Sequence, residues 1–205
     1  MSRGRGSNVE ETRRRLIEAA INLLARDGAQ GASLRAICKE AGQRNTAAVQ
    51  YHFGSREGLF TAALDHVLLA IDQPIDVTPA LSRELGLHPN PSKLQAFVYR
   101  AFLPIVLLER RHPTWGAAGQ GLLARVILGE MEALTAHMEA MVQAEHAAQV
   151  AQLVSLCPGV PAAVMDTRLA IANPAVIIYG IAAAGPKVGL LLDFAAAGLA
   201  APASA

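Results

Sequence analysis

Cysteine is scarce in this sequence of 205 residues, where only Cys38 and Cys157 occur, far apart and without the spacing of a metal site. The polar, arginine-rich stretch from Met1 to Arg15 contains no apolar segment of the kind found in secretory signals. An extracellular disulfide framework is therefore not expected, and each cysteine is interpreted as a small buried apolar residue. No bound metal and no cofactor are predicted.

The sequence also lacks an uninterrupted apolar run long enough to cross a membrane. Its most apolar stretch, residues 175–184, is about half the length of a membrane span. Pro186 and Lys187 then interrupt it. We therefore predict a soluble, cytoplasmic protein with no membrane partner.

Motifs of enzyme chemistry are missing as well. Gly116, Gly119 and Gly121 hint at a phosphate-binding loop, but no strand precedes them and their order is not G-x-G-x-x-G. The acidic helix that contains Glu132 and His137 lacks the Glu-x-x-His and His-x-x-x-His spacings of metal ligands. We predict no catalytic residue and no metal site. A helical enzyme or a ligand carrier without DNA binding stays the alternative, and a purely structural helical protein is a third possibility.

What the sequence does contain is apolar residues, which make up 52% of it, and an uneven charge. Alanine and leucine dominate and no repeat or strand pattern is visible, which predicts an all-α fold. Residues 1–60 carry ten Lys and Arg against six Asp and Glu, whereas residues 61–205 carry eight against eleven. A basic head on an acidic, apolar body suits a protein of which only the head meets phosphate.

Helix start and stop signals predict several helices after a disordered start at residues 1–7. Asn8 with Glu11, Ser33, Asn45 and Ser55 act as predicted caps. In the N-terminal part, the predicted helices cover residues 8–28, 33–42, 45–52 and 56–71. Residues 73–91 are predicted to form a loop with one helical turn near Leu81. Beyond it, the predicted helices cover 92–111 with a kink near Pro104, 122–156 after an irregular glycine-rich segment, 162–183 and 188–199. The resulting domains are a head at residues 8–60 and a body at 61–205.

Three short helices in the head, two of them joined by a tight turn with glycine, are typical of a helix-turn-helix unit. Val49 and Phe53 are spaced to point into the core, which leaves hydrogen-bonding side chains outward. Arginine can pair with guanine, and asparagine or glutamine with adenine, while other groups fix phosphate. The predicted DNA-binding residues are Ser33, Arg35, Arg44, Asn45, Thr46, Ala47, Gln50, Tyr51, His52 and Arg56.

Three runs in the head, residues 33–42, 49–53 and 55–60, resemble the DNA-binding domain of the TetR family. The Tyr-His-Phe run followed by a basic–Glu–x–Leu segment is the most specific part, and the likeness covers about residues 9–64. Between Gly42 and Phe53 the chain is one residue longer than the commonest family spacing. The resemblance implies a transcriptional regulator, a repressor of the kind that binds a palindromic operator in double-stranded DNA.

For the body, the resemblance implies a homodimer formed by the last two helices and a pocket for a small-molecule effector. The sequence agrees with the dimer, because Ile171, Leu190 and Phe194 are among many apolar residues in those helices. Few charges lie among the candidate pocket residues, which predicts a small, largely apolar effector whose binding releases the operator. These residues are Phe97, Phe102, Val106, Trp115, Leu122, Val126, Met138, Met141 and Met165.

Overall fold

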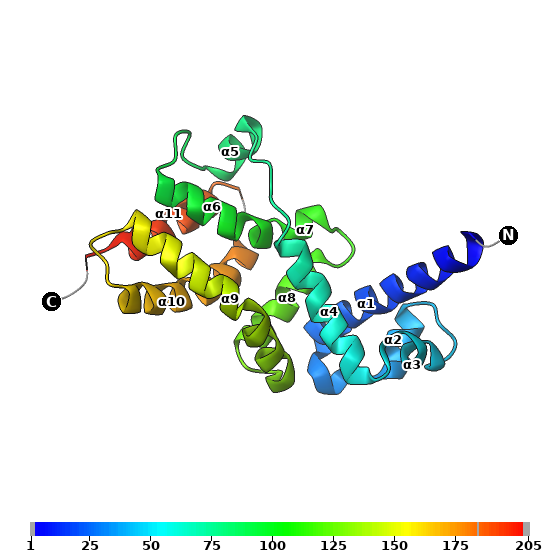
Figure 1. Cartoon of the computed structure of the whole chain (residues 1–205). Coiled ribbons are helices and arrows are strands. Elements are labelled where there is room, and N and C mark those ends of the chain that lie inside the picture. The colour runs from blue at the N-terminus through cyan, green and yellow to red at the C-terminus, as the bar shows by residue number, and fades with distance from the viewer. Residues whose placement is uncertain (1–2, 184, 203–205) are drawn as a thin grey trace. The chain divides into compact units, whose positions relative to one another are not determined.

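The computed structural model of the chain describes residues 3–183 and 185–202, with side chains from residue 8 onward. This part of the chain forms helices and turns without a strand, so the predicted all-α fold is confirmed (Figure 1). The helices are α1 (Arg3–Gly31), α2 (Leu34–Glu40), α3 (Ala47–Phe53), α4 (Arg56–Ile71), α5 (Pro79–Leu85), α6 (Lys93–Val106), α7 (Leu108–Arg111), α8 (Gly116–Ile127), α9 (Glu132–Leu156), α10 (Ala162–Ala182) and α11 (Lys187–Ala200).

The chain forms two compact units. Unit 1 contains the described residues up to Ala70 together with Leu108–Met138, and unit 2 contains Ile71–Leu107 with the described residues from Glu139 onward. Unit 1 therefore combines the N-terminal helices α1–α4 with α7, α8 and the start of α9. Unit 2 contains α5, α6, most of α9, and the last two helices.

The core of the N-terminal helices follows the predicted apolar pattern. Seven residues of α1, two of α2, one of α3 and several of α4 are buried, because their spacing places them on one face of each helix. They include Leu16, Ile17, Ala20, Ile21, Leu23, Leu24, Ile37, Cys38, Val49, Leu59, Phe60, Ala63, Leu64 and Val67.

The first helix differs from the prediction at its start and agrees at its end. It begins at Arg3, so residues 3–7 are helical and Asn8 lies inside the helix instead of capping it. Gly28 has φ 69° and ψ 179°, which interrupts the helix at the predicted residue, and one further turn reaches Gly31. A left-handed backbone of this kind favours glycine.

Two predictions for the middle of the chain were wrong. The segment from Gly116 is regular helix. Its first glycine serves packing, because Gly116 lies against the backbone of Leu108, where a Cβ would overlap the carbonyl oxygen. The helix predicted over residues 122–156 is broken into α8 and α9 by Gly129, whose φ is 75°. The hydroxyl of Thr135 then donates a 2.7 Å hydrogen bond to the carbonyl of Val126.

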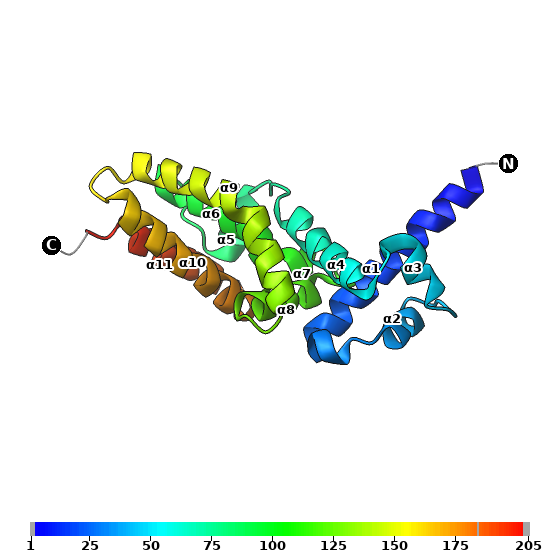
Figure 2. The ribbon, with the colours of Figure 1, turned by 60° about the horizontal axis from the view of Figure 1, so that its bottom comes forward.

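Unit 2 is a packed set of helices in which α6, α10 and α11 contact one another (Figure 2). Ser92 and Gln95 form a capping box at the start of α6. The predicted helix over residues 92–111 ends at Val106, and Leu107 separates it from α7; Pro104, which lacks a backbone N–H, lies three residues before this break.

Helices α10 and α11 match their predicted ranges to within one residue at each end. By length and apolar composition alone, α10 could cross a membrane. Of its most apolar stretch, 28% is buried inside the fold. Its Arg168 donates hydrogen bonds to the carbonyls of Leu199 at 3.0 Å, Ala201 at 2.5 Å and Pro202 at 3.1 Å. One arginine of α10 therefore caps the end of α11, which ties the two helices together.

Candidate DNA-binding surface

The turn between α2 and α3 is built by local hydrogen bonds. The hydroxyl of Ser33 accepts the N–H of Ala36 at 3.2 Å and caps α2. After α2, Gly42 adopts φ 69°, and the N–H of Gln43 donates to the carbonyl of Cys38 at 2.7 Å. The side-chain oxygen of Asn45 accepts the N–H of Ala47 at 2.9 Å, but the residue at the cap position of α3 is Thr46 and not the predicted Asn45. These bonds fix the direction in which α3 leaves the turn.

Helix α3 has one buried side and one exposed side. Val49 is 1% exposed and anchors the helix in the core, as predicted. Phe53 is half-buried, with the Arg13 guanidinium 5.4 Å from its ring centroid. On the other side, Gln50 is exposed and Tyr51 is 76% exposed. The helix thus presents polar side chains to solvent on the face opposite its core anchor.

Eight of the ten predicted DNA-binding residues lie on the exposed surface, and two are half-buried. The exposed ones belong to α2, the turn and α3, so one contiguous segment of the chain carries them. They are Ser33, Arg35, Arg44, Asn45, Thr46, Ala47, Gln50 and Tyr51, while His52 and Arg56 are half-buried.

Several of these ten side chains have partners inside the head. The side chains of Ser33 and Asn45 accept backbone N–H groups, as described above. The guanidinium of Arg56 donates to the carbonyls of Ala29 and Ala32 and lies 4.6 Å from the centroid of the Phe60 ring. His52 has its ring centroid 4.9 Å from that of Tyr51, in an edge arrangement. The side chains without such roles in the turn and α3 are Arg44, Thr46, Ala47 and Gln50, and they form the core of the candidate surface.

The basic residues of the head differ in what surrounds them. Arg14 pairs with Glu11 at 2.8 Å and with Glu18 at 2.6 Å, and Arg15 pairs with Glu11 at 2.7 Å. The hydrogen bonds from Arg14 and then Arg15 hold the pKa of the Glu11 carboxyl below its ordinary value. These arginines are therefore partly neutralised by neighbouring carboxylates on α1. Lys39 is exposed in the last turn of α2 and adds positive charge beside the turn. It was not among the predicted DNA-binding residues.

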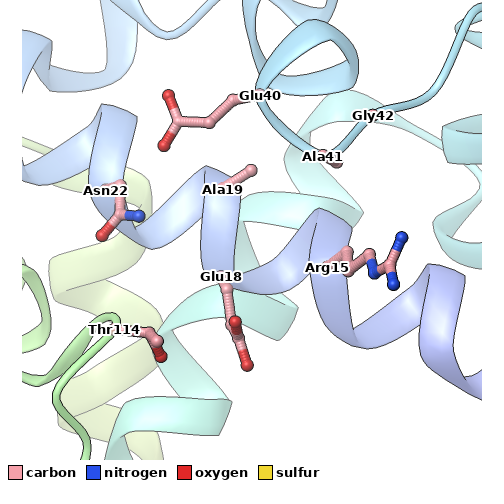
Figure 3. Close-up of a pocket in the computed structure, with 8 residues that line it drawn as sticks. All are labelled: Arg15, Glu18, Ala19, Asn22, Glu40, Ala41, Gly42 and Thr114. Carbon is pink, nitrogen blue, oxygen red and sulfur yellow. The ribbon is translucent and has the colours of Figure 1, made fainter.

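A polar groove lies beside this turn within unit 1 (Figure 3). Its volume is about 330 Å³, and its walls come from α1, the end of α2 and the segment between α7 and α8. Glu40 points from α2 towards α1, whereas the Arg15 side chain of α1 points away from the Glu40 carboxylate (Figure 3). None of the nine predicted effector residues lines this groove, whose walls are Arg15, Glu18, Ala19, Asn22, Glu40, Ala41, Gly42 and Thr114.

The nine predicted effector residues are divided between the two units. In unit 1, Trp115, Leu122 and Val126 are buried and Met138 is half-buried. In unit 2, α6 contributes buried Phe97, Phe102 and Val106 and α10 contributes buried Met165, while Met141 of α9 is 46% exposed. Seven of the nine are therefore core residues of their own units.

Two histidines flank the indole of Trp115 in unit 1. The ring of His112 stacks on it with centroids 4.4 Å apart, and His66 of α4 meets it edge-on at 4.9 Å. Burial lowers the pKa of both imidazoles below the ordinary value. Nearby arginines of α1 and α7 lower these pKa values further, against the opposite effect of the Glu18 carboxylate. Both rings are therefore held in the neutral form.

Acidification should destabilise the protein through this cluster. With lowered pKa values, folded His66 and His112 bind fewer protons than the unfolded chain below about pH 6.5, the ordinary histidine value. Their contribution to stability is complete above that pH and is lost as the pH falls through the folded-state values. Urea unfolding at about pH 7.5 and about pH 5.5 measures the loss. A His66→Gln, His112→Gln variant should lose less stability over this interval, and an equal loss would contradict the assignment.

The features that hinted at enzyme chemistry have structural roles. Gly119 packs against the Trp115 ring and the Leu108 side chain, so it lies in a helix interface and not in a phosphate loop. On α9, His137 pairs with Asp65 at 2.7 Å, and His146 pairs with Asp166 at 2.8 Å. Among the described residues, no group of three or more His, Cys, Asp or Glu could hold a metal ion. Cys38 and Cys157 are buried free thiols, as predicted.

Comparison with known proteins bears on the head and on the fold separately. Residues 16–63 match the model of the family described as bacterial regulatory proteins, tetR family. The crystal structure of a transcriptional regulator from Rhodococcus sp. Rha1 has the same fold, with a TM-score of 0.64 over 91% of this chain and 95% of that chain, at 17% sequence identity. No curated protein matches the chain.

The matched residues contain α2, the turn and α3, which are the elements that carry the exposed polar surface. The helical architecture beyond them is shared with a solved regulator. The family is one of DNA-binding regulators and not of enzymes, which removes the enzyme alternative. Residues 16–63 are therefore a helix-turn-helix domain of the TetR family, whose members are DNA-binding transcriptional regulators.

Proposed function

We propose that this regulator is a cytoplasmic repressor that binds a palindromic operator as a homodimer and releases it when a small, largely apolar effector binds. The observation that carries the proposal is the two-sided helix α3, anchored by buried Val49 and exposing Gln50 on its other side. A helix of this kind fits the major groove, where a glutamine can pair with adenine.

Within the operator, the exposed residues divide into two roles. Thr46, Ala47 and Gln50 reach base edges, and the Ala47 methyl can contact the methyl group of thymine. Arg44 on the turn contacts guanine or phosphate. Ser33, Arg35, Asn45, Tyr51, His52 and Arg56 complete the predicted surface, and their contacts are to phosphate, where they fix orientation. For Ser33, Asn45 and Arg56 the internal hydrogen bonds limit what remains for DNA.

The homodimer is proposed from the exposed apolar residues of α10 and α11. Leu190 is 71% exposed, Phe194 76%, Ile171 66% and Tyr179 67%. Monomeric proteins rarely leave several large apolar side chains in water on adjacent helices. A second copy of the same two helices would cover them in a four-helix interface with two-fold symmetry. That symmetry matches a palindromic operator with two half-sites.

The effector is proposed to lie among the apolar residues predicted for it. The aromatic and apolar residues of α6, together with Met165 of the neighbouring α10, carry no charge, and α6 contacts α10. An apolar ligand matches such a lining better than a charged one. Binding would favour one arrangement of the dimer and shift it away from the DNA-competent arrangement.

The Gln50→Ala variant tests the proposal. A duplex is first selected by the wild-type protein from a random-sequence pool. Loss of one adenine contact in each half-site should weaken its binding at least about 30-fold, since a bidentate base contact contributes about 1–3 kcal/mol and two such contacts are lost. Affinity for a scrambled duplex should change little, because phosphate contacts dominate there. Fluorescence anisotropy at fixed salt measures both affinities.

The matched control is Gln143→Ala, which removes the same side chain from an exposed position on α9. It should bind the selected duplex like the wild type. If the wild-type protein selects no sequence, or if Gln50→Ala and Gln143→Ala bind alike, α3 does not read the operator in the proposed way.

A further inference from the structure

The carbonyl groups at the end of α1 are bound by an arginine from a distant part of the chain. Gly28, with φ 69°, interrupts the first helix one turn before its end at Gly31. Arg125 of α8 donates from Nε to the carbonyl of Ala25 at 2.8 Å and from Nη2 to that of Arg26 at 3.4 Å. One guanidinium therefore binds two carbonyls shortly before the interruption at Gly28.

A second arginine binds the residues that follow. Arg56, at the start of α4, donates to the carbonyls of Ala29 and Ala32. Residues 25–32, which we name the α1–α2 hinge, are thus held by guanidinium groups from two different helices, α8 and α4. The hinge leads directly into Ser33, the residue that caps α2. Its position therefore determines where the helix-turn-helix unit begins.

Helix α8 lies close to the hinge, and Glu130 orients the Arg125 side chain towards it. A Cβ on Gly121 would lie 3.4 Å from the Cβ of Ala25, which is van der Waals distance, so α8 lies directly against α1 at this level. The Glu130 carboxylate binds Nη1 of Arg125 at 2.5 Å. The N–H of Glu130 also donates to the carbonyl of Arg125 at 3.0 Å. The turn after α8 thus holds the guanidinium towards the hinge.

We infer that Arg125 is a positioning residue for DNA recognition, through which α8 sets the position of the α1–α2 hinge and of the helices that follow it. Its planar guanidinium spans two carbonyl oxygens at once, which the single ammonium group of a lysine does with less fixed geometry. A displacement of α8 would reach the hinge through this side chain without passing along α4. The effect on operator reading rests on the proposed function, whereas the effect on the hinge does not.

The test compares Arg125→Gln and Arg125→Lys with Arg83→Gln, which makes the same change at an exposed position on α5 in unit 2. The first measurement is amide hydrogen exchange without DNA at Ala32 and Ser33, whose N–H groups bond to Gly28 and Gly31. Loss of the charged hydrogen bonds in Arg125→Gln should speed exchange there about 10-fold. Amides of α6 and α11 should keep their wild-type rates.

The second measurement is the ratio of affinities for the selected duplex and a scrambled duplex. This ratio should fall about 10-fold in Arg125→Gln, since a misplaced head loses base contacts before phosphate contacts. Arg125→Lys should recover part of both effects, and Arg83→Gln should match the wild type. Wild-type exchange rates at the hinge, or a loosened hinge with an unchanged ratio, would overturn the inference. If the wild type itself prefers no duplex, the operator proposal fails and the exchange rates alone decide whether Arg125 holds the hinge.

Discussion

Leu190→Arg should leave the protein monomeric and remove most of its affinity for the selected duplex. Leu190 is 71% exposed on α11, and Phe194, one turn later, is 76% exposed. In the proposed four-helix interface, both side chains would be buried against the partner copy. An arginine there would lose its hydration without a carboxylate to pair with, a cost that the interface cannot offset.

The effect on DNA binding should be large because the dimer joins two half-sites. Once one head is bound, the second binds at a high effective concentration, which raises affinity by about 100- to 10,000-fold. Sedimentation velocity should show a monomer, and anisotropy should show at least a 100-fold loss on the selected duplex. The fold should survive, since Leu190 lies outside the core; circular dichroism checks this.

Val77→Arg is the matched control for this prediction. Val77 is 39% exposed, but it lies before α5 and not on α10 or α11. A similar change of size and charge there should leave the dimer and its DNA affinity unchanged. A dimeric Leu190→Arg protein would show that the exposed face of α11 is not the interface.

The parts of the fold that could be predicted from the sequence are those set by neighbours in the chain. Ser33 and Ser55 cap helices with their own hydroxyl groups, three residues before the N–H that each accepts. Gly42 and Gly54 end helices with φ values of 69° and 74°, which glycine adopts without strain. These signals act within one turn of helix, so the residue types alone locate α2, α3 and the start of α4.

The errors arose where distant residues decide the structure. Glycine at position 116 looks like a helix breaker, but its missing Cβ makes room for the backbone of Leu108. The break between α8 and α9 lies at Gly129, whose φ is 75°, and a single glycine inside an apolar stretch does not by itself indicate a positive φ. Helix propensity does not distinguish a glycine that loosens a helix from one that permits close packing.

The candidate DNA-binding surface shows the same division. The outward direction of Gln50 and the inward direction of Val49 follow from helical spacing and are confirmed by their burial. The internal partners of Arg56 could not be predicted, since its carbonyl acceptors lie 24 and 27 residues earlier in the chain. Arg125, which binds a carbonyl 100 residues away, gives no signal in the sequence at all.

Gly189→Ala should destabilise unit 2 more than any exposed substitution. Gly189 is buried near the start of α11, and a Cβ there would overlap the carbonyl oxygen of Gly86. Gly86 cannot move aside easily, because it ends α5 with φ 67° and lies against the backbone of Pro186. The obstacle is backbone on both sides, so no change of rotamer relieves it.

The expected cost is about 3 kcal/mol, at the upper end of the usual range for inserting a methyl group into a packed site. For a chain of this size, that lowers Tm by roughly 6–12 °C. Gly159→Ala is the matched control, because a Cβ at Gly159 meets nothing within 4 Å and its φ is not positive. Differential scanning calorimetry should show a Tm near that of the wild type for the control. An equally small change in Gly189→Ala would mean that α5 and α11 separate at little cost, and the close approach of Gly86 and Gly189 would then have no part in holding the last helix in place.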